Sequence, residues 1–368
     1  MKFLKFSSAF LAAMLLFTSC SQVEKKDSIV PTGAATDSAD VTEAITKREL
    51  PWSKLPPRVG EEKVTTKLSE YNGEDVTITM EVSNNEQHPV EQVFFLYVNG
   101  QRNSYSTDEY PDKKPYHIYE IPGGDSIEVT LYFTPYNCKK GEKAIVSIGS
   151  MLDPNYIPES LSLIGFSMFH HLTRGMPPYE LVINQDAPES EYNKISADCT
   201  KIELTEEYEK KHGYIYTDSI TGEAKSRIDS STIFNLYQEE NALEGYYITE
   251  NELTLNLDVC GMGGKFLVGI YVNHELQKAF GDNYYALCDI DRDYLQRFTV
   301  NIDVSELSGF NLIYLIAAPY DPADMESLLY IEKRDSKLVI IGDKNELEAE
   351  IKKAKEELVK EIDAGMWE

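Results

Sequence analysis

Apolar and polar residues alternate with a period of two along much of the chain, beginning near residue 75. Every second residue from Val76 to Val82 is apolar, which places one apolar and one polar face on a β-strand. The next apolar run, residues 93–98, is nearly continuous and is typical of a strand in the middle of a sandwich. Asn99-Gly100 follows it and favours a tight hairpin turn, because both residues tolerate positive φ.

Further short apolar segments follow at intervals typical of strands. They cover residues 116–121, 127–133, 144–148 and 181–183, and Gly, Pro and Asp residues separate them. No long amphipathic helix lies between them. The pattern therefore predicts an antiparallel, all-β architecture.

The same series of segments occurs twice. Tyr97-Val98-Asn99 matches Tyr271-Val272-Asn273 at an offset of 174 residues. Other matches are Val82 with Val259 (177), Val129 with Val300 (171), Asp153 with Asp321 (168) and Leu181 with Leu338 (157). The number of residues between matched positions decreases steadily along the chain, and each decrease lies in a predicted loop. We therefore infer a duplication whose first copy has longer connections.

We therefore predict two related β-sandwich domains, residues 65–190 and 230–343, joined by a partly ordered linker, residues 191–229. The linker contains one strand-like stretch at residues 201–204. In size and strand count, the two domains resemble the immunoglobulin-like modules common on bacterial surfaces. Trp52 and Trp367 both lie outside the repeats, so the core tryptophan of antibody domains is missing and the exact topology stays open.

A C-terminal helix is predicted within residues 344–368. Asn345 is a candidate N-cap with Glu348 three positions later, the reciprocal arrangement that satisfies free amide groups at a helix start. Apolar residues from Leu347 to Ile362 form one narrow stripe. Such a helix is marginal alone, so we expect it to dock either on the second domain or on a helix of another chain.

The N-terminus carries a targeting signal. Lys2 and Lys5 precede the apolar run 6–17, and Phe17-Thr18-Ser19-Cys20 follows. This segment resembles the lipobox of bacterial lipoproteins. The resemblance implies a signal peptide (residues 1–19), cleavage before Cys20 and a diacylglyceryl group on its sulfur. Residues 21–50 are rich in small, polar and charged residues without periodicity, so we expect a lipidated flexible tether over residues 20–64. An ordinary signal peptide is the alternative.

The charge balance restricts the partners. The chain has 35 Lys and Arg residues against 62 Asp and Glu residues, a net charge of −27, which excludes nucleic acid binding through a basic surface. We expect a protein of the cell envelope that faces outside the cytoplasm, with the lipid as its membrane attachment.

Motifs for catalysis or metal binding are missing. The six histidines show no zinc-ligand spacing, and there is no Gly-x-Ser-x-Gly motif. Asp289, Asp291 and Asp293 resemble the opening of a calcium loop, but Tyr294 and Val300 occupy the positions that need Gly and Glu. We predict no catalytic residue, no metal and no cofactor. The pairing of Cys138, Cys199, Cys260 and Cys288 stays open.

Two groups of residues are candidates for binding. The first copy carries ten extra residues within 164–178, including Phe169, His170, His171 and Arg174. Aromatic, Met and Arg side chains are enriched at binding interfaces. Alternatively, the phenylalanine rings fold inward over an open sandwich end. Tyr110 and Tyr116, beside Asp108 and Glu109, would stack on sugars or form ordinary cross-strand pairs.

The most consistent interpretation is a surface-anchored lipoprotein that acts as a non-catalytic binding or assembly module. Its partner outside the cell would be a protein or a glycan. An extracytoplasmic carbohydrate-binding protein or carbohydrate-active enzyme is the alternative, since a catalytic pair among 62 acids cannot be recognised from sequence.

Overall fold

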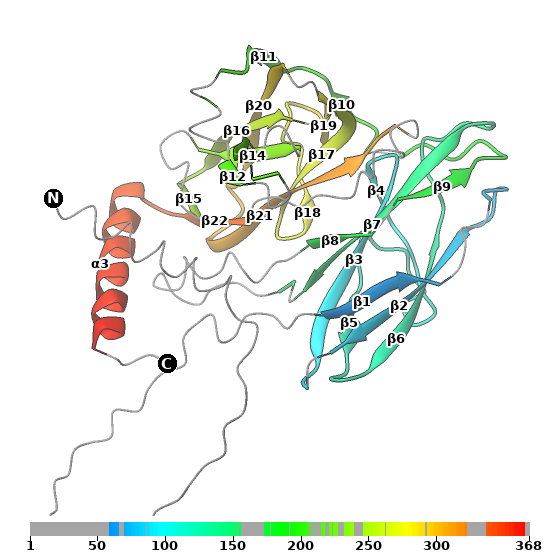
Figure 1. The fold of residues 1–368 in the computed structure, drawn as a ribbon, viewed down its shortest axis with the longest axis horizontal. Helices are drawn as coiled ribbons and strands as arrows, with labels where there is room; N and C mark the ends of the chain where they lie inside the picture. Colours follow the sequence, from blue (N-terminus) through cyan, green and yellow to red (C-terminus); the bar gives the residue numbers. More distant parts are fainter. Residues whose placement is uncertain are drawn as a thin grey trace, which may run out of the picture. The chain divides into compact units, whose positions relative to one another are not determined.

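Two repeated immunoglobulin-like β-sandwiches and a C-terminal helix make up the fold, and the predicted all-β class is confirmed (Figure 1). The computed structural model describes residues 59–65, 70–85, 87–152, 154–155, 173–176, 178–190, 192–205, 208, 215–217, 221–222, 224–226, 232–238, 246–261, 263–290, 293–321 and 336–364. The predicted signal peptide and most of the predicted tether lie outside these residues. The last residues assigned to the tether, Val59–Val64, instead form the first strand, β1.

The first sandwich consists of two antiparallel sheets. One has the order β1-β2-β6, and in the other β3 and β7 are central, with β4 and β5 beside β3 and with β8 and β9 beside β7. The strands are β1 (Val59–Val64), β2 (Val76–Asn84), β3 (Val90–Val98), β4 (Gln101–Asn103), β5 (Ile118–Ile121), β6 (Ser126–Phe133), β7 (Lys143–Leu152), β8 (Thr173–Gly175) and β9 (Tyr179–Val182). The order matches the A-B-E and C′-C-F-G arrangement of immunoglobulin-like domains.

The second sandwich repeats this plan with additional strands. Its sheets have the orders β11-β20-β16-β14 and β10-β19-β17-β21-β22-β15, with β18 beside β17. The strands are β10 (Ile195–Ser196), β11 (Thr200–Glu203), β14 (Ile233–Tyr237), β15 (Tyr246–Thr249), β16 (Glu252–Cys260), β17 (Gly264–Val272), β18 (Glu275–Leu276), β19 (Tyr285–Ile290), β20 (Tyr294–Asp303), β21 (Gly309–Pro319) and β22 (Ser336–Ile341). A separate hairpin is formed by β12 (Ile215–Thr217) and β13 (Ala224–Ser226).

Identical turn contacts relate the two copies. Asn99 donates its backbone N–H to the carbonyl of Ile145 (2.8 Å), and its side-chain oxygen accepts the Ile145 N–H (2.8 Å). Asn273 makes the same two bonds with Leu312, at 2.9 and 3.0 Å. Strands β2, β3, β6 and β7 therefore correspond to β16, β17, β20 and β21.

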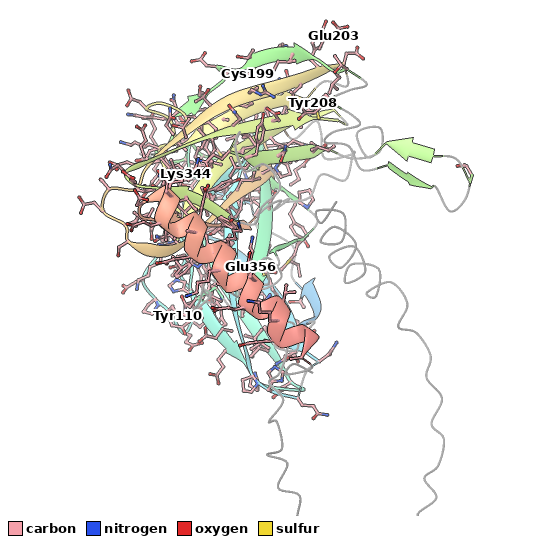
Figure 2. The ribbon with its side chains drawn as sticks, turned by 90° about the vertical axis from the view of Figure 1, so that its left-hand side faces the viewer. Tyr110, Cys199, Glu203, Tyr208, Lys344 and Glu356 are labelled. Atoms are coloured by element: carbon pink, nitrogen blue, oxygen red, sulfur yellow. The ribbon has the colours of Figure 1, made fainter. Side chains whose placement is uncertain are left out.

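The segment predicted as a linker contributes strands to the second sandwich. β10 pairs in parallel with β19, and β11 pairs antiparallel with β20, so residues 195–203 extend both sheets on the same side. Cys199 directly precedes β11, Glu203 ends it, and Tyr208 follows it in the chain (Figure 2). Among the described residues, no corresponding strands extend the first sandwich beside β5 and β6.

Each sandwich has its own apolar core, and a third apolar cluster joins the two sandwiches. This joining cluster contains Val93, Phe95, Tyr97 and Met151 from the first copy and Tyr271, Leu312, Tyr314, Ile316 and Ala318 from the second. The hydroxyls of Tyr97 and Tyr271, which are equivalent residues of the repeat, lie 3.2 Å apart. The copies thus meet through equivalent strands, as identical subunits do about a two-fold axis.

Arg102 is buried at this junction, and no carboxylate among the described residues pairs with it. Its guanidinium lies 5.0 Å from the ring centre of Phe95, 5.1 Å from Tyr271 and 5.5 Å from Tyr116. One guanidinium nitrogen donates to the carbonyl of His274 at 2.7 Å. Ring faces attract a desolvated cation, and this attraction offsets part of the cost of burying Arg102.

Gly100 is required where the first hairpin approaches the second sandwich. Its φ of 75° lies in the left-handed region. A Cβ atom there would lie 2.8 Å from the Cβ of Leu267 and 3.1 Å from the carbonyl oxygen of Ala318. Any other residue would strain the turn and separate the two sandwiches.

The helix α3 (Lys344–Asp363) docks on its own chain. Leu347 and Ile351 pack against a cluster of the second sandwich that includes Ile248 and Ile340. The predicted N-cap, Asn345, is wrong: Asp343 accepts the backbone N–H of Glu346 at 2.9 Å, so the helix begins two residues earlier. Glu346 then occupies the third position of the capping box.

The joining cluster predicts a large stability cost for Phe95→Ala. Removing a fully buried phenylalanine costs about 3–5 kcal/mol of unfolding free energy, measured by urea denaturation. Val182→Ala, at a position that is 36% exposed, is the control and should change this free energy by less than about 0.5 kcal/mol. A Phe95→Ala protein as stable as the control would show that the cluster does not join the sandwiches.

Candidate functional site

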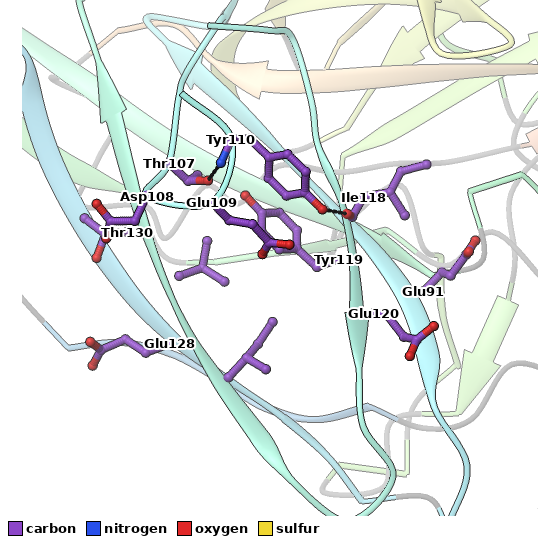
Figure 3. A pocket seen from close by; sticks show the side chains of 12 residues that line it. Glu91, Thr107, Asp108, Glu109, Tyr110, Ile118, Tyr119, Glu120, Glu128 and Thr130 are labelled. Carbon is purple, nitrogen blue, oxygen red and sulfur yellow. Dashed lines mark hydrogen bonds between the residues drawn. The ribbon is translucent and has the colours of Figure 1, made fainter. Parts of the chain in front are cut away.

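An open groove lies on the side of the first sandwich that β10 and β11 cover in the second. It has a volume of about 460 Å³. Its lining residues are Glu91, Thr107, Asp108, Glu109, Tyr110, Ile118, Tyr119, Glu120, Ile127, Glu128, Val129 and Thr130. We call it the β5–β6 groove, because these two strands supply seven of its twelve lining residues (Figure 3).

The groove is bordered by like-charged pairs. Glu91 on β3 faces Glu120 on β5 in register, and Glu81 on β2 faces Glu128 on β6 in register. Directly opposed like charges destabilise a sheet. Asp108 and Glu109 add two further carboxylates to the lining. A cation bound here would relieve repulsion that the folded chain otherwise retains.

The second sandwich has opposite charges at the corresponding positions. Lys265 faces Asp289 where the first copy has Glu91 and Glu120. Asp258 faces Arg297 where the first copy has Glu81 and Glu128. Arg297 donates two hydrogen bonds to the fully buried Asp258, at 2.7 and 2.8 Å, and the carboxylate raises the pKa of the Arg297 guanidinium.

Two tyrosine hydroxyls also donate hydrogen bonds to the Asp258 carboxylate. The hydroxyls of Tyr208 and Tyr237 donate to its second oxygen at 2.9 and 3.1 Å. Tyr208 follows the covering strand β11 in the chain and donates to Asp258. The covering segment is therefore linked to the Asp258–Arg297 ion pair by a hydrogen bond. The first sandwich has neither the covering strand nor a cation at these positions among its described residues.

Aromatic residues form the other wall of the groove. The Tyr110 hydroxyl donates to the carbonyl of Ile118 at 3.1 Å, and the Tyr110 ring stacks on His117 with centres 4.8 Å apart. Burial lowers the pKa of His117, so the imidazole is kept neutral. Burial raises the pKa of Tyr119 to about 12. The wall is therefore an uncharged, ordered surface beside the acids.

The two predicted sugar-stacking residues are not brought together. Tyr110 lines the groove, with Asp108 and Glu109. Tyr116 instead packs against the cluster that joins the sandwiches, close to Arg102. The shared platform on which the carbohydrate interpretation depended is therefore not formed by these two rings.

The other predicted residues lie elsewhere or outside the described residues. Arg174 is on β8, where its backbone pairs with Ser150 of β7. Cys20, Phe169, His170 and His171 are outside the described residues.

Cys138, Cys199 and Cys288, in the described part of the chain, are free thiols. Cys138, Cys260 and Cys288 are buried and Cys199 is partly exposed. Burial raises the pKa of Cys138 to about 11, which keeps this thiol protonated and weakly nucleophilic. No group of three or more His, Cys, Asp or Glu side chains within the described residues could hold a metal ion. Within the same residues, no helix has the length and apolar character needed to cross a membrane.

Comparison with known proteins gives no family assignment. No protein-family model matches the chain, and no curated protein matches it. Among solved structures, the chain is similar to a complex of the Salmonella enterica SafA pilin with the SafB chaperone (9% identity, 78% of this chain, 100% of that chain, TM-score 0.23). It is also similar to the fibronectin(III)-like modules of Clostridium thermocellum CbhA (10% identity, 76% and 94%, TM-score 0.18).

A third similar structure is a Porphyromonas gingivalis protein of unknown function (10% identity, 77% and 100%, TM-score 0.22). These TM-scores are too low to support a functional argument. The interpretation of the groove therefore rests on the chain itself.

Sequence reasoning missed the groove, although part of the signal was present. The offset of 174 residues aligns Glu91 with Lys265 and would have shown the change of charge. Aligning Glu128 with Arg297 requires the strand register. Val129 pairs with Met80, and Phe298 pairs with Leu257 at the corresponding place. Val129 therefore corresponds to Phe298 in the structure. The sequence match at an offset of 171, which aligns Val129 with Val300, differs from this correspondence by two residues.

Glu128→Arg should stabilise the protein, because it gives Glu81 the opposed cation that Asp258 has in the second copy. An opposite-charge pair in place of a repulsive one is worth about 0.2–1 kcal/mol in unfolding free energy, measured by urea denaturation. Glu128→Gln, which only removes the repulsion, should give a smaller gain. A loss of stability in both variants would contradict the repulsion inferred between Glu81 and Glu128.

Proposed function

We propose that this protein is a lipid-anchored binding or assembly module of the bacterial cell envelope, and that it holds a protein partner in the β5–β6 groove. The contrast between the copies carries the proposal: one fold occurs twice, with this side closed and charge-paired in the second copy and open and acidic in the first. Stability alone favours the closed form, since paired charges and covered edges both stabilise a sheet. An open acidic copy is therefore best explained by ligand binding.

The junction between the copies supports this function. The nine buried residues of the joining cluster connect the groove-bearing sandwich to the second one, and the second one carries the docked helix α3. A sandwich fixed in this way can present its groove without losing much conformational freedom on binding, and such preorganisation increases affinity. The lipobox-like Cys20 segment motivates the membrane attachment.

Site-specific photo-crosslinking in the native envelope tests the proposal. A photoreactive phenylalanine analogue at Tyr110, which lines the groove, should give a defined adduct with an envelope protein. The same analogue at Tyr294, which is 42% exposed on the second sandwich, is the control and should not give it. The double variant Glu120→Lys/Glu128→Arg should reduce the Tyr110 adduct at least about tenfold.

The Cys20→Ser variant tests the anchor in the same cells. It should leave the membrane fraction and partition into the aqueous phase after detergent phase separation, whereas the unaltered protein should enter the detergent phase. Equal adducts at Tyr110 and Tyr294, or adducts indifferent to the double variant, would refute groove binding. Retention of the Cys20→Ser protein in the detergent phase would refute the lipid anchor.

A further inference from the structure

Strand β6 has one hydrogen-bonding edge that is almost unused. Among the described residues it pairs as a strand with β2 only, and its other edge makes a single bridge, between Ser106 and Tyr132, at 3.0 and 2.8 Å. Backbone groups of alternate residues point to the same edge of a strand. The N–H and C=O groups of Glu128 and Thr130 therefore point to the same open edge as those of Tyr132.

The chain itself shows what such an edge accepts. In the second copy, β11 pairs antiparallel with β20 over four residues, from Thr200 opposite Arg297 to Glu203 opposite Tyr294. Arg297 corresponds to Glu128 in register. One extended segment thus closes the second sandwich at the place where the groove of the first is open.

We propose that an extended segment of a partner polypeptide adds to β6 as an antiparallel strand, with apolar and Lys or Arg residues alternating along it. This rests on the proposed function and specifies the partner's chemistry. Ile127 on β6 is partly buried in the groove lining and matches the apolar side chains of the incoming strand. The carboxylates of Glu120 and Glu128 match its basic side chains.

Charge complementarity selects this occupant over a second copy of the same chain. The second sandwich supplies its own cations, Lys265 and Arg297, opposite its acids, whereas the first copy has glutamates at both positions. A further copy of a chain with a net charge of −27 would add repulsion. A basic strand would instead neutralise the pairs that the first sandwich leaves unbalanced.

Peptide binding to the detergent-solubilised full-length mature protein tests the proposal. The probe is a fluorescent, end-blocked nonapeptide that alternates Lys and Val, measured by anisotropy. The Glu120→Lys/Glu128→Arg protein should bind it at least about tenfold more weakly. The matched control is Asp282→Lys/Glu306→Arg, the same charge change at exposed positions of the second sandwich, and it should bind within about threefold of the unaltered protein.

Two N-methylated forms of the peptide separate strand addition from charge attraction. Methylating every second amide blocks one edge of the strand, and methylating the intervening amides blocks the other. One form should lose binding at least about tenfold and the other should retain it. Equal binding by both forms, or by a peptide of the same composition with its Lys residues in one block, would overturn strand addition.

The outcome is distinguishable from failure of the proposed function. A groove-dependent envelope adduct at Tyr110, combined with no binding of the alternating peptide, would overturn the basic strand and leave the binding module standing. Self-association of the unaltered protein that Glu120→Lys/Glu128→Arg abolishes would replace the basic partner by a second copy and would also overturn this inference.

Discussion

Unpaired backbone groups at the edge of a β-sheet must bind water, another strand or a partner, and this constraint governs how the two halves of the chain differ. The second sandwich satisfies it internally, because residues 195–203 return along β19 and β20 and extend both sheets. In the first sandwich, the described residues leave most of the β6 edge open. The groove, its acidic border and the inferred mode of binding all follow from that one difference.

The charged residues of the two sandwiches differ in the same way as their sheet edges. Covering Asp258 removes it from water, and a buried carboxylate is stable only when it is paired and hydrogen-bonded, as Arg297, Tyr208 and Tyr237 provide. Glu81 and Glu128 face each other without such a cover, and solvent makes their repulsion tolerable. An approaching strand would exclude that solvent, so only a basic one would lower the free energy of the acids.

Local patterns were sufficient to predict the strands, the duplication and the helix, because period-two alternation and turn residues act over a few positions. They were not sufficient for features that depend on where distant segments meet. The covering role of residues 195–203 and the packing of Tyr116 beside Arg102 depend on contacts between segments far apart in the chain. The charge contrast was partly visible in Glu91 and Lys265, but that between Glu128 and Arg297 needed the strand register.

Amide hydrogen exchange at two equivalent residues tests the central claim most directly. The backbone N–H of Glu128 points to the open edge of β6, and that of Arg297 lies on the edge of β20 that pairs with β11. In the free protein, the account predicts rapid exchange at Glu128, slow exchange at Arg297, and slowing at Glu128 when the alternating Lys-Val peptide is added. Equal protection of the two amides in the free protein would show that the first sandwich is already closed and would contradict the account.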